Sequence, residues 1–505
     1  MAASPGSPGA VAAPSTGGTS PDSSRTNSRA GWLITLYAGG GEFCDGYILS
    51  IIGVALPLVT SAFRLGPGGA GLIGSASLVG MFAGGLAFGY VTDRIGRRKV
   101  YLAAIAAFIV LSALQYGADA AWQLVVLRFL MGVAIGADFA IAGTIAAEFA
   151  PERSRGPLMV VLVTMWSAGA AVAYAVGWLM LRGGIDDWRL LLASSAVPAA
   201  VVLLLRLRTP ESPQWLLSQG RVEEARAVLR RMGGDVGALV APVRPAVTPR
   251  YSDIFRNGYG RRTLFVCLFW CCQLLPIYAI TTYEPTILAS FGLGEGTDSY
   301  LGAVAVQLFF VLGSLSGMLM VNRGRRALLL WSFGASVLPL AGLAAVADPP
   351  VWLVVLLFAV FGVTAFASQC LQALYPSELF PTEVRATANG FAAGVSRVGA
   401  AIGTFGAPVL LGHSTRLAML VGAGIAAAGW LATLVLAPET RGLSLDEAAA
   451  SDEPDSSLNA PDRSLATPTG TAASAASAPS TSSTPTAPST SSTSSTSSTE
   501  VTDLI

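Results

Sequence analysis

Twelve long apolar runs constrain the fold of this 505-residue chain more than any other feature. Each is about 20 residues or longer, the length that a helix needs to cross the hydrocarbon core of a bilayer. Only helices and closed barrels satisfy their backbone hydrogen bonds in lipid, so runs of this length predict an all-α membrane protein with twelve transmembrane helices. The runs cover residues 32–60, 70–91, 99–117, 121–148, 157–181, 187–207, 262–290, 299–321, 326–347, 350–377, 387–411 and 416–437.

The composition favours a membrane protein and disfavours several other classes. Apolar residues make up 53% of the chain and charged residues only 12%, with a mean hydropathy of +0.60. These values lie far from those of soluble globular proteins. The net charge of +1 gives no basis for nucleic-acid binding. The sequence shows no nucleotide-binding motif, nucleophile–base pair or metal-ligand spacing, so we expect neither an enzyme nor a cofactor.

Three motifs of the first half return in the second half. The offsets are 230, 228 and 228 residues, so the two halves run in the same chain direction. Parallel repeats build one transporter architecture, in which the solute site lies between the halves. The pairs are Glu148-x-x-Pro151-x-x-x-Arg155 with Glu378-x-x-Pro381-x-x-x-Arg385, Gly89-x-x-x-Asp93-Arg94-x-Gly96-Arg97-Arg98 with Gly317 to Asn322-Arg323-Gly324-Arg325-Arg326, and Pro210-Glu211-Ser212 with Pro438-Glu439-Thr440.

The repeat predicts two six-helix bundles, residues 31–207 and 262–437, joined by a polar central loop, residues 208–261. The loop contains a short amphipathic helix pattern. Residues 1–30 and most of residues 438–505 are rich in small and polar residues and cannot bury enough apolar surface to offset the entropy of ordering. We therefore expect both terminal segments to be disordered.

The basic residues of the short loops predict the orientation. Loops after the second, fourth, eighth and tenth helices carry ten Lys or Arg residues, against four in the alternate loops. Because cytoplasmic loops are enriched in positive charge, we expect the first set and both termini in the cytoplasm. The first set is Arg94, Arg97, Arg98, Lys99, Arg153, Arg155, Arg323, Arg325, Arg326 and Arg385, and the second is Arg64, Arg182, Arg189 and Arg416.

The repeated motifs match those of a known family. The motif from Gly89 to Arg98 resembles the loop 2–3 signature of the major facilitator superfamily. Arg128-x-x-x-Gly132, the Glu-x-x-Pro-x-x-x-Arg motifs and the Pro-Glu motifs resemble sugar-porter signatures. The resemblance covers roughly residues 32–445. It implies a twelve-helix fold that works by alternating access.

Most of these motif residues lie at the expected cytoplasmic ends of helices. Opposite charges there can pair when the inner side is closed and separate when it opens. Each partly solvated pair contributes modestly, but several together can bias a two-state equilibrium. We interpret them as a gate, with simple orientation by inside charge as the alternative. The residues are Asp93, Arg94, Arg97, Glu148, Arg155, Glu378 and Arg385.

Three acids and one arginine lie inside predicted helices. Glu42 and Asp45 are three residues apart, hence on one face of the first helix, and Asp138 lies in the fourth. A carboxylate in the bilayer is costly, so it usually faces a cavity and acts on protons, ions or solutes, although a helix-packing hydrogen bond is the alternative. Arg128 in the fourth helix is expected either to fix that helix against the first, or to pair with Asp45 until protonation breaks the pair.

Two short stretches resemble proton symporters, each with a departure. Asp45-Gly46-Tyr47 resembles the start of the Asp-Gly-x-Asp signature of aromatic-acid/proton symporters, but Ile48 replaces the second acid. Gly-Ala-Asp138-Phe139 resembles a stretch of phosphate/proton symporters. The seventh helix lacks the acid of a phosphate carrier, which disfavours phosphate. Proton coupling must then rest on Asp45 or Asp138, and we expect Asp45 to be the principal residue.

Polar and aromatic side chains of both halves are candidate contacts for a solute. Amides and hydroxyls orient a solute while ring faces cover its apolar parts. For each of them, packing or an interfacial position is the alternative. The candidates are Tyr47, Trp166, Gln273, Tyr278, Tyr283, Gln369, Gln372 and Asn389.

These patterns predict a monomeric secondary transporter in the cell membrane. Its partners would be the lipid bilayer, protons and a small polar organic solute, a sugar or an organic-acid-like metabolite. The replacement of the second acid by Ile48 leaves a proton-independent uniporter or a drug or metabolite exporter as the alternative. A membrane sensor with a transporter fold would usually carry a long ordered extension, and the tail here is of low complexity.

Overall fold

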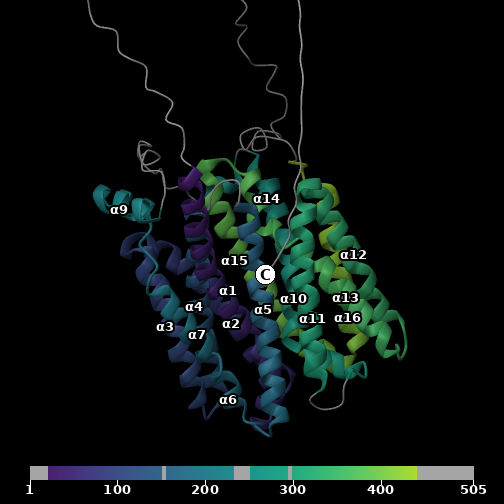
Figure 1. Ribbon diagram of the computed structural model, residues 1–505. Helices are drawn as coiled ribbons and strands as arrows, with labels where there is room; N and C mark the ends of the chain where they lie inside the picture. Colours follow the sequence, from purple (N-terminus) through teal and green to yellow (C-terminus); the bar gives the residue numbers. More distant parts are fainter. Residues whose placement is uncertain (1–20, 150–154, 233–250, 257, 294–297, 441–505) are drawn as a thin grey trace, which may run out of the picture. The chain divides into compact units, whose positions relative to one another are not determined.

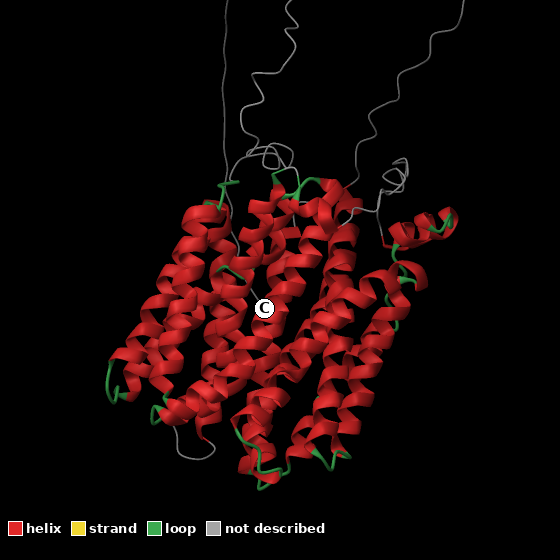
Figure 2. Cartoon of the chain, turned by 180° about the vertical axis from the view of Figure 1, so that it is seen from behind, coloured by secondary structure: helices red, strands yellow, loops and turns green. Residues whose placement is uncertain are grey.

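The computed structural model describes residues 21–149, 155–232, 251–256, 258–293 and 298–440. All regular structure in these ranges is helical, and they contain no strand (Figures 1 and 2). The prediction of an all-α protein is confirmed.

The first half consists of six apolar crossings, of which the sixth is built from two consecutive helices. A short α8 and an amphipathic α9 follow, and α9 confirms the helix expected in the central loop. The helices are α1 (Pro21–Ala62), α2 (Pro67–Ile95), α3 (Arg97–Tyr116), α4 (Ala121–Phe149), α5 (Arg155–Arg182), α6 (Trp188–Ala193), α7 (Ala196–Arg206), α8 (Pro213–Ser218) and α9 (Val222–Met232).

The second half repeats the order of crossings after a short 3-10 turn. Here the fourth crossing of the half is built from two pieces. The elements are η3 (Tyr251–Phe255), α10 (Tyr259–Ser290), α11 (Asp298–Met320), η4 (Val321–Arg323), α12 (Arg325–Ala345), α13 (Val351–Ala367), α14 (Leu371–Leu379), α15 (Thr382–His413) and α16 (Thr415–Leu436).

The twelve predicted crossings are present, but two of them are not continuous helices. Eleven segments are long and apolar enough to span a membrane, with α6 and α7 counted together, and the shorter apolar α13 supplies the twelfth. The predicted run 350–377 breaks between α13 and α14. There the amides of Gln369 and Leu371 donate to carbonyls three residues earlier, at 3.1 and 3.0 Å. Such bonds tighten the chain and end the α-helix.

The N-terminal boundary also differs from the expectation. Helix α1 begins at Pro21, inside the segment 1–30 that we expected to be disordered. Proline is tolerated in the first turn of a helix, and extending an existing helix costs little compared with starting one. Residues 1–20 and 441–505 lie outside the described ranges, so the expected disorder of these segments stays a prediction.

Glycines let helices α2 and α4 approach closely. A Cβ atom at Gly80 or Gly84 would overlap the backbone carbonyls of Phe129 and Val133 in α4. A Cβ at Gly85 would meet nothing within 4 Å. Close contacts of this kind replace the hydrophobic driving force that is missing between helices in lipid.

The motif repeat has a matching geometry in the two halves. Gly96 and Gly324 both have positive φ, +107° and +141°, between consecutive helices. In the first half the Glu211 carboxylate accepts a hydrogen bond from the Arg98 amide at 3.0 Å. In the second half Glu439 accepts from the Arg325 amide at 3.1 Å. The two bundles are therefore structural repeats at their charged ends.

The apolar core differs between the two ends of the bundle. We call the end where α9 and α14 lie the α9 end, and the opposite end, where α6 lies, the α6 end (Figure 1). Toward the α6 end, one buried cluster combines side chains of both halves, such as Leu191 and Ile287. Toward the α9 end, the clusters around Tyr101 and around Phe265 each belong to one half. The two halves are thus packed together most extensively toward the α6 end.

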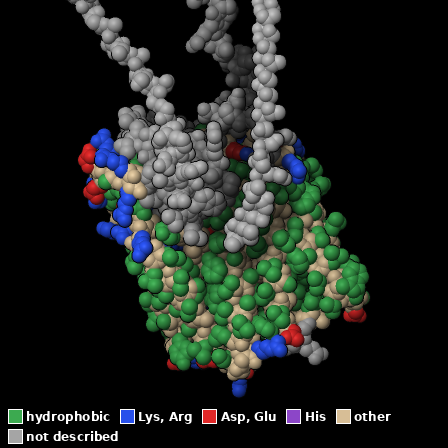
Figure 3. Space-filling model, viewed as in Figure 1, with side chains coloured by type: hydrophobic (Ala, Val, Ile, Leu, Met, Phe, Trp, Pro, Cys, Tyr) green, Lys and Arg blue, Asp and Glu red, His purple; other side chains and the backbone are tan. Residues whose placement is uncertain are grey.

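The visible lateral surface is apolar. Hydrophobic side chains cover the flank of the described helices, and charged side chains gather at the two ends (Figure 3). This distribution suits a protein surrounded by lipid.

Candidate functional site

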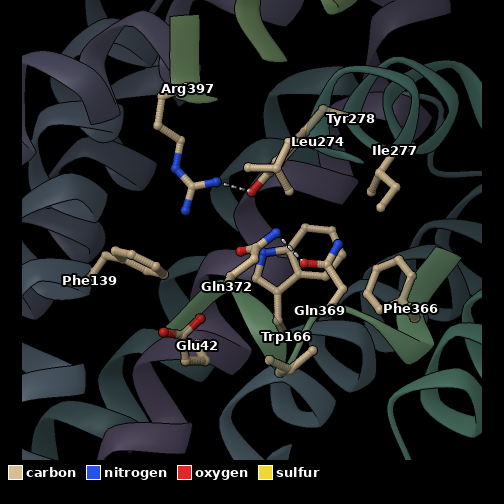
Figure 4. A pocket seen from close by; sticks show the side chains of 11 residues that line it. Glu42, Phe139, Trp166, Leu274, Ile277, Tyr278, Phe366, Gln369, Gln372 and Arg397 are labelled. Carbon is tan, nitrogen blue, oxygen red and sulfur yellow. Dashed lines mark hydrogen bonds between the residues drawn. The ribbon is translucent and has the colours of Figure 1, made fainter. Parts of the chain in front are cut away.

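A cavity lies between the two bundles (Figure 4). It contains about 440 Å³ of space free of atoms, part of which is open to solvent. Helices α1, α4 and α5 contribute from the first half, and α10, α13, α14 and α15 from the second. The lining residues are Glu42, Phe139, Val163, Trp166, Leu274, Ile277, Tyr278, Phe366, Gln369, Gln372 and Arg397.

Aromatic rings form one wall of this cavity. The Trp166 ring meets Tyr278 edge-on, with centroids 5.8 Å apart, and stacks with Phe366 at 6.1 Å. Trp166 belongs to the first half and the other two to the second, so the wall crosses the interface between the bundles. Such rings can cover the apolar face of a small solute.

An amide network supports the wall at the break between α13 and α14. Gln372 donates through Nε2 to Oε1 of Gln273 at 2.8 Å, and also to Oε1 of Gln369. Gln273 in turn donates to the Ser368 hydroxyl at 2.7 Å. At this break Gln369 and Gln372 line the cavity, and Gln273 accepts from Gln372 without lining the cavity itself.

Two opposite charges enter the cavity from different halves. The Glu42 carboxylate and the Arg397 guanidinium lie on opposite sides of it (Figure 4). Arg397 donates to the Tyr278 hydroxyl at 3.4 Å, and its guanidinium lies 4.8 Å from the centroid of the Phe139 ring. Among the described residues, Arg397 has no carboxylate oxygen within 4.0 Å.

Asp45 lies one helical turn from Glu42 and is 1% exposed. Its Oδ1 atom has no hydrogen-bond partner in the described part of the chain. Asp45 is not among the residues that line the cavity.

The expected pairing of Arg128 with Asp45 is not formed. Arg128 is also 1% exposed, but its Nη1 donates to the Ile48 carbonyl at 3.2 Å, one turn along α1 from Asp45. Its Nε and Nη2 atoms are without partners in the described ranges. In this conformation Arg128 therefore fixes α4 against α1, which is the structural alternative for this residue.

Asp138 is paired with an arginine that the sequence did not suggest. Arg206, at the end of α7, donates through both terminal nitrogens to the two oxygens of Asp138, at 3.0 Å for Nη2. Its Nε donates to the Tyr37 carbonyl at 3.2 Å, and the guanidinium lies over the Tyr101 ring. This buried pair ties α4 to α7 and leaves Asp138 outside the cavity lining.

The predicted solute contacts divide into two groups. Trp166, Tyr278, Gln369 and Gln372 line the cavity, with Gln273 directly behind them. Three others do not line it. The Tyr47 hydroxyl bonds Ser194 at 2.8 Å, the Tyr283 hydroxyl donates to the Ala70 carbonyl at 3.5 Å, and Asn389 lies in the first turns of α15. The sequence alone does not show whether a tyrosine hydroxyl bonds a neighbouring helix or faces the cavity.

For the predicted gate residues, the hydrogen bonds seen among the described residues stay inside one half. Glu378 accepts from Arg325 at 2.9 Å and from the Thr440 hydroxyl at 2.6 Å. Arg385 donates to the Phe380 carbonyl at 3.0 Å. In the first half, Arg97 donates to the Ser212 hydroxyl at 3.3 Å, and Arg94 is exposed. The side chains of Asp93, Glu148 and Arg155 lie outside the described residues.

Comparison with known proteins identifies the family. Residues 35–451 match the family described as sugar (and other) transporter. The chain belongs to this family. Two similar proteins from Escherichia coli K12 are YaaU, 41% identical over 82% of this chain and 93% of YaaU, and the inner membrane metabolite transport protein YgcS, 36% identical over 80% of this chain and 91% of YgcS.

A solved structure shows the same fold. It is the inward-open conformation of the xylose transporter XylE from E. coli, with a TM-score of 0.70 at 22% identity, covering 83% of this chain and 99% of XylE. The twelve-helix fold expected from the resemblance to the major facilitator superfamily is thereby confirmed. This sugar-transporter family member is a multi-pass membrane transporter of sugar or metabolite type, and not an enzyme.

Two buried arginines of this transporter were not predicted as site residues, although their positions in the sequence could have indicated them. Arg397 lies inside the predicted run 387–411 and Arg206 inside the run 187–207. The rule that singled out the intramembrane acids, that a charge in the bilayer needs a partner or a cavity, applies equally to these arginines. Glu284 in the run 262–290 is a further example. It is fully buried and accepts from Gln307 at 2.8 Å.

Proposed function

We propose that this transporter moves a small polar organic solute together with protons, by alternating access. The observation that carries the proposal is a cavity between the bundles that combines amides, aromatic rings and charges, one helical turn from Asp45, whose Oδ1 atom has no partner in the described residues. YgcS is named as a metabolite transporter and XylE as a xylose transporter, which supports a small polar solute.

Alternating access is supported by the unequal closure of the two ends. Toward the α6 end, the Tyr174 hydroxyl of α5 donates to the Thr281 carbonyl of α10, and side chains of both halves share one apolar cluster. The apolar clusters toward the α9 end stay within single halves. Rocking of one bundle against the other around the cavity would exchange the closed and open ends.

Proton coupling is supported by the surroundings of Asp45. A buried carboxylate with an unsatisfied oxygen is costly, and a bound proton removes that charge. Glu42 lies on the same helix face and lines the cavity, so solute binding and protonation of this pair can influence each other. We assign Asp45 the principal proton-linked role and Glu42 a role in contact with the solute.

The proposal includes an orientation. Arg94, Arg98 and Lys99 are exposed at the α9 end, and Arg323 is exposed at the equivalent place in the second half. Because positive charge is retained in the cytoplasm, the α9 end would face inward. The motif charges at this end would then act on the inner gate.

The alternative is a proton-independent uniporter or exporter. It is favoured by one observation, that Ile48 stands where proton symporters carry a second acid. The two functions differ in whether solute can be concentrated.

Transport by purified protein in liposomes distinguishes them. A screening set of radiolabelled sugars and organic acids is offered with an acidic exterior, with and without a protonophore. We expect at least one solute to accumulate above its external concentration and this excess to vanish with the protonophore. Uptake that only reaches equilibrium and ignores the protonophore would establish the uniporter.

A further inference from the structure

We propose that the solute is an organic carboxylate that carries a hydrogen-bond donor at its opposite end. The carboxylate would bind Arg397 and the donor would bind Glu42. This inference rests on the proposed function because it assigns the solute of the same cavity.

Arg397 has unused binding capacity. It lies in the interior of α15 and is 8% exposed, yet its only hydrogen bond in the described ranges is the 3.4 Å contact with the Tyr278 hydroxyl. A guanidinium has five donors and keeps its charge. The rings of Phe139 and Tyr278 lie beside it, at 4.8 and 5.8 Å, but ring faces compensate only part of a desolvated charge.

The other buried arginines do not show this pattern. Arg206 is neutralised by Asp138, and Arg262 donates to the Leu379 carbonyl at 2.8 Å. Arg128 does not line the cavity. Within the described part of the chain, Arg397 is thus the guanidinium that both faces the cavity and lacks a carboxylate. An anionic ligand is the partner that this geometry lacks, and carboxylates match the guanidinium fork with two parallel bonds.

The rest of the cavity defines the other parts of the ligand. Glu42 is 9% exposed and faces the cavity from α1, opposite Arg397 (Figure 4). A carboxylate at this place accepts hydrogen bonds, so it fits a hydroxyl or an ammonium group. The rings of Trp166 and Phe366 line the same cavity and can cover an apolar body. A neutral sugar would leave Arg397 without a carboxylate in direct contact.

Ligand binding tests the inference without any proton gradient. Thermal stabilisation of the full-length transporter in detergent is measured with matched probes, because a ligand of the native state raises its melting temperature. The pairs are gluconate and glucose, 4-hydroxybutyrate and 4-hydroxybutyramide, and 4-hydroxybenzoate and 4-hydroxybenzamide. We expect at least one acid to stabilise and its neutral counterpart to be at least tenfold weaker. Benzoate, compared with 4-hydroxybenzoate, tests the donor, and 4-hydroxybutyrate against 4-aminobutyrate separates hydroxyl from ammonium.

Variants assign the effect to the two residues. Arg397→Gln should weaken the acid about 100-fold and bring acid and neutral probe to similar affinity. Arg397→Lys should retain part of the preference because it keeps the charge without the fork. Glu42→Gln should reduce the advantage of the donor. Arg416→Gln, an exposed arginine at the start of α16, is the matched control and should leave all affinities unchanged.

Each outcome decides the inference. Stabilisation by glucose or another neutral probe with equal or better affinity than its acid would overturn it, as would the absence of stabilisation by every acid of the set. An unchanged acid preference in Arg397→Gln would also overturn it. If Arg397→Gln does not fold, the ratio of acid to neutral affinity in the wild type and the behaviour of Arg397→Lys still test the inference. Carboxylate binding without uphill transport would refute the proposed proton coupling and leave this inference standing.

Discussion

Two buried acids of the first bundle differ in what surrounds them. Asp138 has both oxygens occupied by Arg206, whereas Asp45 has an oxygen without a partner in the described residues. Removing one member of a buried ion pair strongly destabilises the folded protein, because the other charge is left uncompensated. Neutralising a carboxylate that has no ionic partner leaves no such uncompensated charge. The two acids should therefore respond in opposite ways to neutralisation.

Asp138→Asn should destabilise the protein by about 3–5 kcal/mol, since it leaves Arg206 buried without a counter-charge. Asp45→Asn should leave stability unchanged or raise it. Thermal unfolding in detergent compares the two. The double variant Asp138→Leu/Arg206→Met should recover most of the loss, because apolar side chains can replace a buried pair. Equal stability of Asp138→Asn and the wild type would show that the pair does not hold α4 to α7.

Asp45→Asn should separate exchange from accumulation. Without a titratable group at this place, the variant should abolish uptake against a gradient and retain exchange of labelled for unlabelled solute, which needs no net proton movement. Both are measured in liposomes with an imposed pH difference. An Asn variant that still concentrates solute would refute the assignment of Asp45.

At the scale of single residues, the sequence predicted which residues would matter better than it predicted which residues they contact. The cost of burying charge singled out Asp45 and Glu42, and Glu42 does line the cavity. The same cost did not reveal that Asp138 meets Arg206, because residues 68 positions apart are brought together only by helix packing. Nor did it reveal that Tyr47 bonds Ser194 away from the cavity.

At the scale of the elements, the charged ends of the helices form equivalent assemblies. Glu211 and Glu439 each accept from the start of a helix that follows a glycine with positive φ. Glu378 joins this arrangement in the second half through Arg325 and Thr440. Since these bonds stay within one half, each assembly can move as a rigid end of its bundle.

Glu378→Gln should slow transport about tenfold without weakening solute binding. The variant loses a charge-assisted pair that joins α12 to α14, and such bonds contribute about 1.5–3 kcal/mol. Glu378 does not line the cavity, so affinity should be unaffected. Turnover and thermal-shift affinity are compared with those of Glu224→Gln, which removes an exposed pair with Arg221. A large loss of affinity at normal turnover would contradict the gate.

The positions of the helices could be predicted from the sequence, but the breaks within the crossings could not. Apolar length alone located the crossings to within a few residues, because the bilayer dictates it. The break between α13 and α14 depends on the hydroxyls and amides around Ser368, which bond Ser332 and Gln273 from other helices. Bonds to other helices leave no periodic signal in the sequence, so the break could not be predicted. The break matters because Gln369 and Gln372, beside it, line the cavity.

At the scale of the whole molecule, the orientation of the bundle in the membrane is open to a direct test. The proposal places the α9 end in the cytoplasm because of its exposed basic residues. A single cysteine is introduced at Ser218 in α8, or at Gly184 in the loop at the α6 end, in a variant without the five native cysteines. An impermeant maleimide should label intact cells only at position 184. Labelling at 218 from outside would invert the topology.

The central claim is that protons and solute move together through one cavity. The most direct measurement is the pH difference that stops net solute flux in liposomes, with the membrane potential held at zero. A tenfold gradient of solute stores about 1.4 kcal/mol, as does one pH unit. With one proton per solute, efflux from a tenfold higher interior should therefore cease when the exterior is about one pH unit more acidic. Efflux that continues unchanged at every pH difference would contradict proton symport.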